Sequence, residues 1–391
     1  MSVPKIRLGI YGVFGRGNFG NEATLAAFLT RIGTDRFEPI IFCEDPEAAA
    51  AIHEIPAKRI APPADASSRS GVRRIRAILG NRLAFLTGSI RAMRTVDALV
   101  IPGTGVWERY GSGAFGVKFE LWCIGIGARL ARKPFVILNV GAEYLPRRSA
   151  RFLVRGAGRA ATYRSYRDAL SRDSARDMGV PTKGDVVSTD LAFSLDLSRE
   201  RPDATRRVCV GVMNYWGRDS VHETSHAVRE RYAANCVDLV RRLRVQGRVV
   251  HLVGGDDEDL LLAAELAATL GDGTPVIDAR SPGDLILEYS RAEVVVATRY
   301  HSLIMALLAG TPTVSIGYSE KHRSMLSQLG LPDVHFDIYS FEPAEVAAAV
   351  AELAADRSEL SAAIDAGVGR ARGRLDSEWP QIEAILLSGS R

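Results

Sequence analysis

The sequence predicts an α/β protein made of two lobes, each with a parallel β-sheet. Short apolar runs rich in β-branched residues alternate with helical segments, as is typical of parallel sheets with right-handed crossovers. The 391 residues exceed one ordinary hydrophobic core, and the polar, proline-containing segment 197–207 has the composition of a linker. We therefore expect an N-terminal Rossmann-like lobe over 1–197, a C-terminal Rossmann-like lobe over 207–375 and a C-terminal tail over 376–391.

The composition indicates a globular protein of the cytoplasm. Hydrophobic residues make up 47% of the chain and charged residues 25%, and the formal net charge of +4 is too small to indicate a nucleic-acid partner. The four cysteines have no paired spacing, which fits a reducing compartment and predicts neither a disulfide framework nor a zinc site. The N-terminal apolar run is too short for a signal peptide, and no apolar stretch is long enough to span a bilayer.

The first glycine-rich turn follows the first predicted strand. Residues 6–13 predict that strand, residues 22–32 a helix, and the segment between them matches G-x-G-x-x-G from Gly15 to Gly20. Glu44 and Asp45 follow the next predicted strand, where an acid would contact the ribose of a dinucleotide. A tight turn that only lets the helix pack on the strand explains the glycines equally well.

A basic segment follows a predicted loop over 52–70. Seven arginines and no acid occur between Arg69 and Arg94, and apolar residues recur there at helical spacing. We favour a surface helix that packs on its own lobe. The alternative is an amphipathic helix that docks on an anionic membrane or a lipid-linked acceptor. The protein would then be peripheral at the inner membrane face.

The remaining elements continue the alternation. Residues 107–119 are expected to form a loop beside the active cleft. Further strands are expected at 38–42, 96–101, 134–140, 163–166, 185–188, 208–213, 248–253, 275–278, 294–296 and 313–316. Further helices are expected at 121–131, 151–161, 171–178, 228–246, 256–270, 282–290, 303–309, 343–353 and 357–375.

The stretch 294–317, VVVATRYHSLIMALLAGTPTVSIG, carries the clearest chemical signal. A β-branched strand leads into a short apolar helix, and Arg299, His301 and Ser302 lie at the transition between them. In open α/β sheets, ligands bind at this carboxyl edge, where free N–H groups at a helix start attract anions. A fixed cation beside a titratable imidazole therefore predicts an anionic substrate and proton transfer.

Two literal metal motifs are set aside. His222 to His226 matches H-E-x-x-H, but its surroundings are polar and no third ligand follows. The acids at 257–259 resemble a D-x-D site, yet they stand where acids favour a helix N-terminus. We expect no metal.

Several motifs in order resemble the polysaccharide pyruvyl transferase family over about residues 6–321. The likeness begins at Gly17-Asn18-Phe19-Gly20-Asn21-Glu22-Ala23, where the family usually has Asp at the position of Asn21. The middle signatures are Tyr166-Arg167-Asp168 with Ser171, and Thr189-Asp190-Leu191-Ala192-Phe193. The C-terminal block runs from Arg299-Tyr300-His301-Ser302 through Ala309-Gly310-Thr311-Pro312 to Tyr318 and Lys321. Gly103-Thr104-Gly105 stands where the family usually has three glycines.

This resemblance implies two Rossmann-like lobes that face each other across a cleft, as in GT-B glycosyltransferases. It also implies phosphoenolpyruvate as co-substrate, with no other cofactor, bound on the C-terminal side. The acceptor, bound on the N-terminal side, would be a sugar diol of a polysaccharide or a lipid-linked precursor, and the product a pyruvate ketal. Arg167 from the first lobe would meet Arg299 and His301 from the second. The expected substrate-binding residues are Gly17, Asn18, Gly20, Glu22, Gly103, Thr104, Gly105, Asp190, Ser302 and Lys321.

The residue types suit that chemistry. Arginine stays charged and pairs two oxygens at once, so Arg167 and Arg299 are expected to hold the donor's carboxylate and phosphate. His301 is expected to be the general acid and base. Two other hypotheses stay open: a GT-B glycosyltransferase whose glycine-rich turn and Arg299 hold a nucleotide-sugar diphosphate, and a non-catalytic binding or scaffold protein that keeps the fold.

Overall fold

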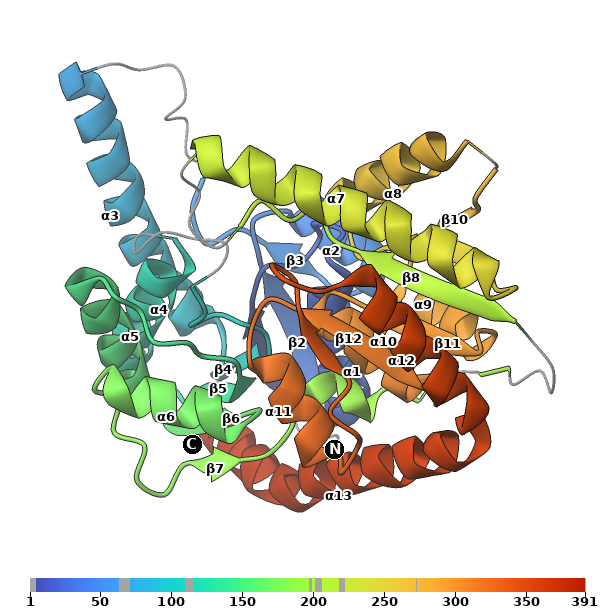
Figure 1. Ribbon diagram of the computed structural model, residues 1–391. Coiled ribbons are helices and arrows are strands. Elements are labelled where there is room, and N and C mark those ends of the chain that lie inside the picture. The colour runs from blue at the N-terminus through green and yellow to red at the C-terminus, as the bar shows by residue number, and fades with distance from the viewer. Residues whose placement is uncertain are drawn as a thin grey trace. The chain divides into compact units, whose positions relative to one another are not determined.

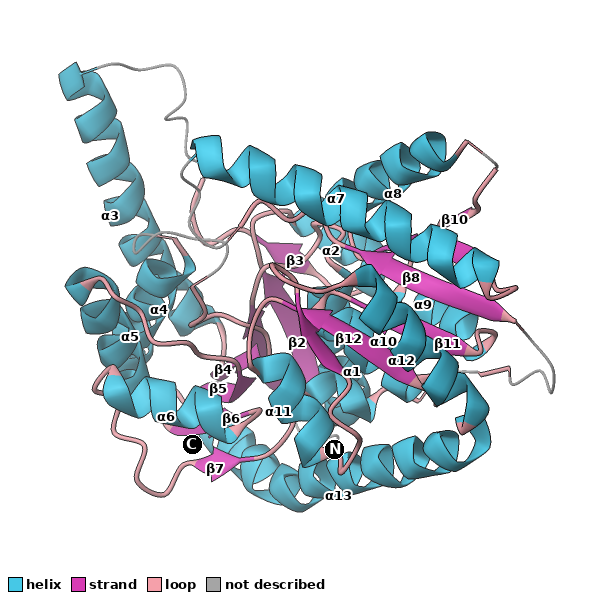
Figure 2. Cartoon of the chain, in the orientation of Figure 1, coloured by secondary structure: helices cyan, strands magenta, loops and turns pink. Residues whose placement is uncertain are grey.

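A computed structural model describes residues 5–62, 71–109, 116–196, 199–200, 206–217, 222–271 and 273–390 (Figures 1 and 2). The chain forms two compact units. The first contains residues 1–16, 24–194 and 374–391, and the second contains residues 17–23 and 195–373. The start of the first helix, Gly17–Ala23, thus groups with the second unit.

The first unit is built on a seven-stranded sheet in which all paired strands are parallel. Its order is β3-β2-β1-β4-β5-β6-β7. The strands are β1 (Ile6–Tyr11), β2 (Phe37–Phe42), β3 (Ala57–Lys58), β4 (Ala98–Pro102), β5 (Phe135–Val140), β6 (Tyr163–Tyr166) and β7 (Val186–Val187). Every residue of β4 and β5 is buried, as expected for central parallel strands covered on both faces.

Helices follow most of these strands. They are α1 (Phe19–Ile32), α2 (Pro46–His53), α3 (Gly71–Thr95), α4 (Val117–Ala131), α5 (Arg148–Ala160) and α6 (Ala169–Asp177), with a 3₁₀ turn at Leu191–Ser194. The helices α3, α4 and α5 lie next to one another, with α4 in the middle. Together they bury the core around Met93, Leu121 and Val154.

The second unit repeats the plan with a six-stranded sheet of order β10-β9-β8-β11-β12-β13. Its strands, all paired in parallel, are β8 (Arg207–Val212), β9 (Val249–Gly254), β10 (Val276–Ile277), β11 (Val294–Ala297), β12 (Thr313–Gly317) and β13 (His335–Asp337). Its helices are α7 (His222–Val245), α8 (Asp257–Leu270), α9 (Pro282–Ser290), α10 (Tyr300–Leu308), α11 (Lys321–Gln328) and α12 (Pro343–Ala355).

Both sheets have the Rossmann strand order, because each runs 3-2-1-4-5-6 when its strands are numbered from its own start. The prediction of an α/β fold with two Rossmann-like lobes is therefore confirmed. The order reverses between β1 and β4 in the first sheet and between β8 and β11 in the second. Ligands of such sheets bind outside the carboxyl ends of the strands at this reversal.

The structure also departs from several expected boundaries. The expected loop over 52–70 contains the end of α2 and β3, and residues 63–70 lie outside the described part. The expected tail over 376–391 instead continues α13 (Arg357–Leu387) and a 3₁₀ turn, and residues from Arg374 onward group with the first unit. Of the expected linker, residues 197–198 and 201–205 lie outside the described part. The helix α7 begins at His222, six residues before its expected start.

Among the described helices, none combines the length and the apolar character needed to cross a membrane.

Candidate functional site

Arg299 lies at the strand-order reversal of the second sheet. The strand β11, three consecutive valines and an alanine, is fully buried between β8 and β12. Arg299 then caps α10, whose residues from Ser302 to Leu308 are all buried. The helix begins at Tyr300, three residues earlier than predicted, so His301 and Ser302 belong to its first turn.

Two carboxylates hold Arg299 in place. Its Nε and Nη2 donate to the two oxygens of Asp259 at 2.5 and 2.8 Å, and Nη2 lies 2.5 Å from Asp256. Burial lowers the pKa of Arg299, but the hydrogen bonds and charge of Asp259 outweigh it, so the pKa rises above its ordinary value. An incoming anion would thus meet a guanidinium that is permanently charged and fixed in orientation, on a side chain that is 19% exposed.

The acids at 257–259 lie in the first turn of α8, which confirms the prediction that they stand at a helix N-terminus. The N-cap residue is Asp256, whose side chain accepts from the N–H of Asp259 at 3.0 Å. Asp259 is fully buried and accepts further from the backbone N–H groups of Asn214 and Gly255. It is the positioning partner of Arg299, a role that only the fold brings out because the two residues are 40 positions apart.

His301 packs against the glycine-rich turn. A Cβ atom built on Gly20 would lie 2.1 Å from His301 Nδ1, so the imidazole needs a glycine there. Asn18 fixes the turn, because its side-chain oxygen accepts from the N–H groups of Gly20 and Asn21 at 3.1 and 3.2 Å. Gly17 has a φ of +69°, which favours glycine, and Glu22 is buried in the first turn of α1.

Lys321 and Ser302 complete this group in the second unit. Lys321 is buried, and its Nζ lies 4.7 Å from the ring centroid of Tyr318 and 5.4 Å from that of Tyr300. Ser302 is also buried, with its hydroxyl 2.6 Å from that of Tyr289. Both aromatic rings therefore contribute cation–π attraction to the ammonium group of Lys321.

His322 is a buried histidine whose pKa is shifted far from its ordinary value. Its ring nitrogens lie 3.0 Å from the carbonyl of Ser319 and 3.2 Å from that of Thr298, next to Arg299. Burial, with the charge of Lys321 as a smaller cause, lowers the pKa of His322 to about 3. Between the ordinary histidine pKa and this value, the unfolded chain binds a proton that the native protein does not bind.

Acidification should therefore destabilise the protein through His322. Its contribution to stability is complete above about pH 6.5 and falls by about 1.4 kcal/mol per pH unit below it. In urea unfolding, the free energy of unfolding should fall less steeply from pH 7 to pH 5 in His322→Gln than in the parent. His226→Gln, at an exposed histidine of the same unit, is the matched control. Identical slopes for the parent and His322→Gln would contradict the assignment.

In the first unit, Arg167 follows β6 and is surrounded by carboxylates. Its guanidinium contacts Glu108 closely and lies 3.5 Å from both Asp168 and Asp190. The side chain of Arg167 is 2% exposed. Asp168 caps α6 by accepting from the N–H of Ser171 at 2.6 Å, and Asp190 accepts from the N–H of Ala192. Glu108, Asp168 and Asp190 thus hold the guanidinium of Arg167 in place.

Glycines let Glu108 and Arg167 reach the backbone at the ends of β4 and β5. A Cβ on Gly105 would lie 2.5 Å from the Glu108 carboxyl carbon, and one on Gly141 would lie 2.6 Å from the Arg167 guanidinium. Gly103 likewise approaches Thr24, with 2.3 Å between its built Cβ and the Thr24 methyl group.

The same strand ends carry unusual backbone. Thr104 and Asn139 have φ values of +67° and +50°, although neither is a glycine. Such conformations are strained and are concentrated at functional sites. Asn139 is held by its amide, which donates to the Thr189 carbonyl at 2.8 Å, and by Ser165, which donates to its side-chain oxygen.

Lys118 adds a second buried cation to the first unit. It is 2% exposed, and burial lowers its pKa, against the opposing charges of Glu108 and Glu143. Buried ionisable groups beside strained strand ends are a pattern of functional sites. Sequence reasoning missed Lys118, Glu108 and Asn139, although the position of Glu108 just after Gly103-Thr104-Gly105 was an available signal.

The structure thus gathers the predicted residues into two groups. The group in the second unit contains Gly17, Asn18, Gly20, Glu22, Arg299, His301, Ser302 and Lys321. The group in the first unit contains Gly103, Thr104, Gly105, Arg167 and Asp190. Arg299, His301, Ser302 and Lys321 follow strands of the second sheet, and the group in the first unit follows strands of the first sheet. Residues 17–22 follow β1 of the first sheet, although they group with the second unit. Their individual roles stay predictions.

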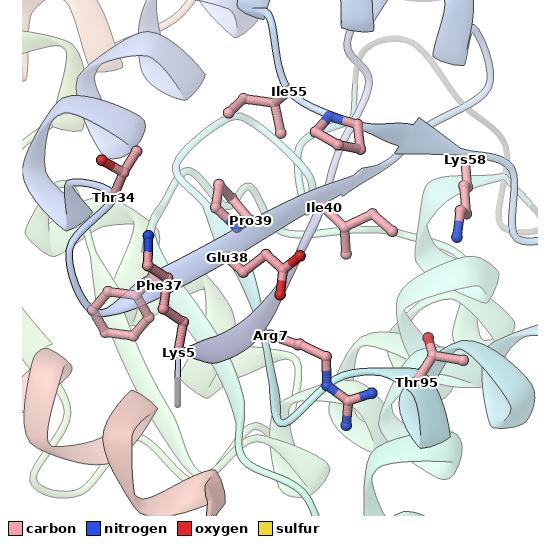
Figure 3. Close-up of a pocket in the computed structure, with 11 residues that line it drawn as sticks. Lys5, Arg7, Thr34, Phe37, Glu38, Pro39, Ile40, Ile55, Lys58 and Thr95 are labelled. Atoms are coloured by element: carbon pink, nitrogen blue, oxygen red, sulfur yellow. The ribbon is translucent and has the colours of Figure 1, made fainter. Parts of the chain in front are cut away.

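A separate hollow of about 860 Å³ lies in the first unit (Figure 3). Its lining includes Lys5, Arg7 and Phe37, at or near the amino ends of β1 and β2, together with Lys58 of β3. None of the predicted site residues lines it. In the described part of the chain, no three His, Cys, Asp or Glu side chains gather so that they could hold a metal ion.

Solved structures share this architecture over nearly the whole chain. Anabaena Alr3699/HepE in complex with UDP-glucose has a TM-score of 0.62 at 14% identity, covering 98% of this chain and all of that one. The UDP-GlcNAc 2-epimerase of Neisseria meningitidis, bound to UDP-GlcNAc, has a TM-score of 0.60 at 10% identity, covering 98% and 99%. At these identities the likeness shows the fold alone.

Sequence comparison is more specific. The amylovoran biosynthesis protein AmsJ of Erwinia amylovora is 32% identical over 92 residues, which span 22% of this chain and 22% of AmsJ. The model of the polysaccharide pyruvyl transferase family matches residues 18–320, a range that includes Arg167, Arg299 and His301. Since this match covers more than half of the sequence, the chain belongs to the polysaccharide pyruvyl transferase family.

Proposed function

We propose that the protein transfers the pyruvyl group of phosphoenolpyruvate to two hydroxyls of a sugar, forming a pyruvate ketal. The observation that carries this proposal is the group around Arg299, where two cations and an imidazole lie at the carboxyl edge of the second sheet. Family membership supports transfer of a pyruvyl group during polysaccharide biosynthesis. A carboxylate and a phosphate on one small donor would match the fixed charges of Arg299 and Lys321.

In the proposed reaction, His301 gives a proton to the methylene carbon of phosphoenolpyruvate, which becomes the ketal methyl group. The cationic C2 then accepts the two sugar oxygens, and the bond from C2 to the phosphate oxygen breaks. Of the two hydroxyl protons, one restores the imidazolium of His301 and the other leaves with inorganic phosphate. General acid–base catalysis of this kind contributes about 10²–10⁴-fold.

The group in the first unit would bind the acceptor. Sugar hydroxyls are hydrogen-bond donors, and Glu108 and Asp190 supply carboxylate acceptors at the ends of the first sheet. In this proposal Arg167 sets the positions of those carboxylates. We infer that the acceptor is a polysaccharide or glycolipid precursor of the cell envelope. The four cysteines are buried and none is in a disulfide, which is compatible with a reaction in the cytoplasm.

The competing proposal is a glycosyltransferase that uses a nucleotide sugar, since structures that share the fold carry UDP-sugars. Thermal unfolding separates the two. A ligand at about a hundred times its Kd stabilises the protein by about 2.7 kcal/mol, so phosphoenolpyruvate should raise the Tm and UDP-glucose should not. Phosphate release from phosphoenolpyruvate should further require a glycan acceptor. Stabilisation by UDP-glucose alone would overturn the proposal.

A further inference from the structure

The helix α3 carries a stripe of apolar side chains that is buried in the C-terminal half of the helix and exposed in the N-terminal half. Ala92 and Met93 near its end belong to the core of the first unit. At the other end, Ile75, Leu79 and Leu83 follow one another at intervals of four residues and are 58%, 57% and 62% exposed. Figure 1 shows this N-terminal half of α3 running out beyond α4 and α5. Three large apolar side chains therefore face solvent on one side of a helix.

The adjoining helices α4 and α5 carry aromatic rings of their own. Phe152 on α5 is 54% exposed, and its ring centroid lies 6.3 Å from that of Trp122 on α4. Phe119 lies 6.0 Å from Trp122 in turn. Gly156 makes room for Trp122, because a Cβ there would lie 2.4 Å from the indole. Tryptophan and phenylalanine at a surface are typical of the interface between water and lipid.

The sequence of these helices is rich in arginine. Residues 66–96, which include α3, contain seven arginines and no acid, and residues 145–161, which include α5, contain five arginines and no acid. The one acid of α4, Glu120, is part-buried and accepts a hydrogen bond from the hydroxyl of Tyr11. The exposed residues Arg76, Arg148 and Arg159 are examples of the cations on this side.

We propose that this α3–α4–α5 surface, which includes Ile75, Leu79, Leu83, Trp122, Phe152 and the exposed Arg76, Arg148 and Arg159, binds an anionic lipid bilayer. The apolar side chains would enter the boundary between head groups and acyl chains, and the arginines would pair with lipid phosphates. A nucleic acid would use the arginines but not the exposed aliphatic stripe. A second copy of the chain would bring two strongly basic faces together, which like-charge repulsion opposes.

Binding to a bilayer does not depend on which group the enzyme transfers. Membrane binding bears on catalysis only if the proposed function holds. The enzyme would then act at a membrane surface, where a lipid-linked sugar is concentrated.

The test is co-sedimentation of the full chain with vesicles at low salt. We expect binding to phosphatidylcholine vesicles that contain about one third phosphatidylglycerol, and little binding to phosphatidylcholine alone. Added salt should weaken the binding, because it screens exposed charges. Absence of binding to the anionic vesicles, or equal binding to both compositions, would overturn the proposal.

Matched variants localise the surface. Leu79→Ser with Leu83→Ser should weaken partitioning of the protein onto the vesicles at least about tenfold, because two leucine side chains are no longer transferred from water into lipid. Arg76→Gln with Arg148→Gln should weaken it about 25-fold, at about fivefold per arginine. Leu261→Ser, at a leucine 72% exposed on α8, and Arg280→Gln, at an arginine side chain 79% exposed, are the controls and should bind as the parent does.

Circular dichroism checks that each variant is folded. Parent-like binding of both double variants would overturn the assignment of the surface. Light scattering without lipid addresses the second-copy alternative: a dimer that Leu79→Ser with Leu83→Ser dissociates would assign the stripe to self-association and would also overturn the proposal.

Discussion

Replacing His301 by Ala should lower the turnover of pyruvyl transfer by about 10²–10⁴-fold, with little change in stability. The imidazole lies in the first turn of α10, next to Arg299, and would deliver the proton to the donor's methylene carbon. Without that proton, C2 does not become electrophilic enough for two hydroxyls to add. The measurement is steady-state phosphate release with phosphoenolpyruvate and a glycan acceptor.

His251 provides a matched control. It lies on β9 in the same unit, and burial lowers its pKa, yet no site residue contacts it among the interactions described above. His251→Ala should keep turnover within a few-fold of the parent. If His301→Ala does the same, His301 is not the acid and base.

A second variant reaches His301 without changing it. Gly20→Ala would place a methyl group 2.1 Å from His301 Nδ1, so the ring must move and turnover should fall as in His301→Ala. Gly369→Ala is the control, since a Cβ on this helical glycine of α13 meets nothing within 4 Å. Folded Gly20→Ala protein with parent-like turnover would show that the position of the ring does not matter.

The sequence predicted the two sheets, and the strand ends that Arg167 and Arg299 follow, because these depend on local signals. Three valines before a polar break define β11, and the carboxyl end of a parallel strand is where ligands bind. The short β3 and α2 were missed, since two to eight residues carry too little periodic pattern to separate them from a loop.

The partners of the predicted cations could not be read from the sequence in the same way. Arg299 pairs with Asp259, which is 40 positions away in the sequence, and Arg167 pairs with Glu108, which is 59 positions away. Each pair joins residues that follow two strands separated by one other strand, β9 and β11 on either side of β8, and β4 and β6 on either side of β5. The pairs therefore depend on strand order. Arg167 and Arg299 were expected to hold the donor, and each is already paired with carboxylates. Each of these arginines therefore has a structural role in an ion pair, which the sequence alone does not reveal.

Replacing Arg167 by Met should destabilise the first unit by about 3–5 kcal/mol, the usual cost of breaking a buried ion pair from one side. Its guanidinium lies among Glu108, Asp168 and Asp190, and Asp190 is 1% exposed. Removing the cation leaves several carboxylates buried together. Urea unfolding measures the loss. Arg172→Met, which breaks a pair with Asp173 that is 37% and 39% exposed, should cost less than about 1 kcal/mol.

The pH dependence separates this explanation from a simple packing defect. In Arg167→Met, burial and mutual repulsion should raise the pKa values of the remaining carboxyl groups. The native variant then binds more protons than its unfolded chain, so its stability should fall as the pH rises. The gap between parent and variant should therefore be wider at pH 8 than at pH 5. A gap that does not change with pH would mean that lost van der Waals contacts, and not uncompensated charge, cause the destabilisation.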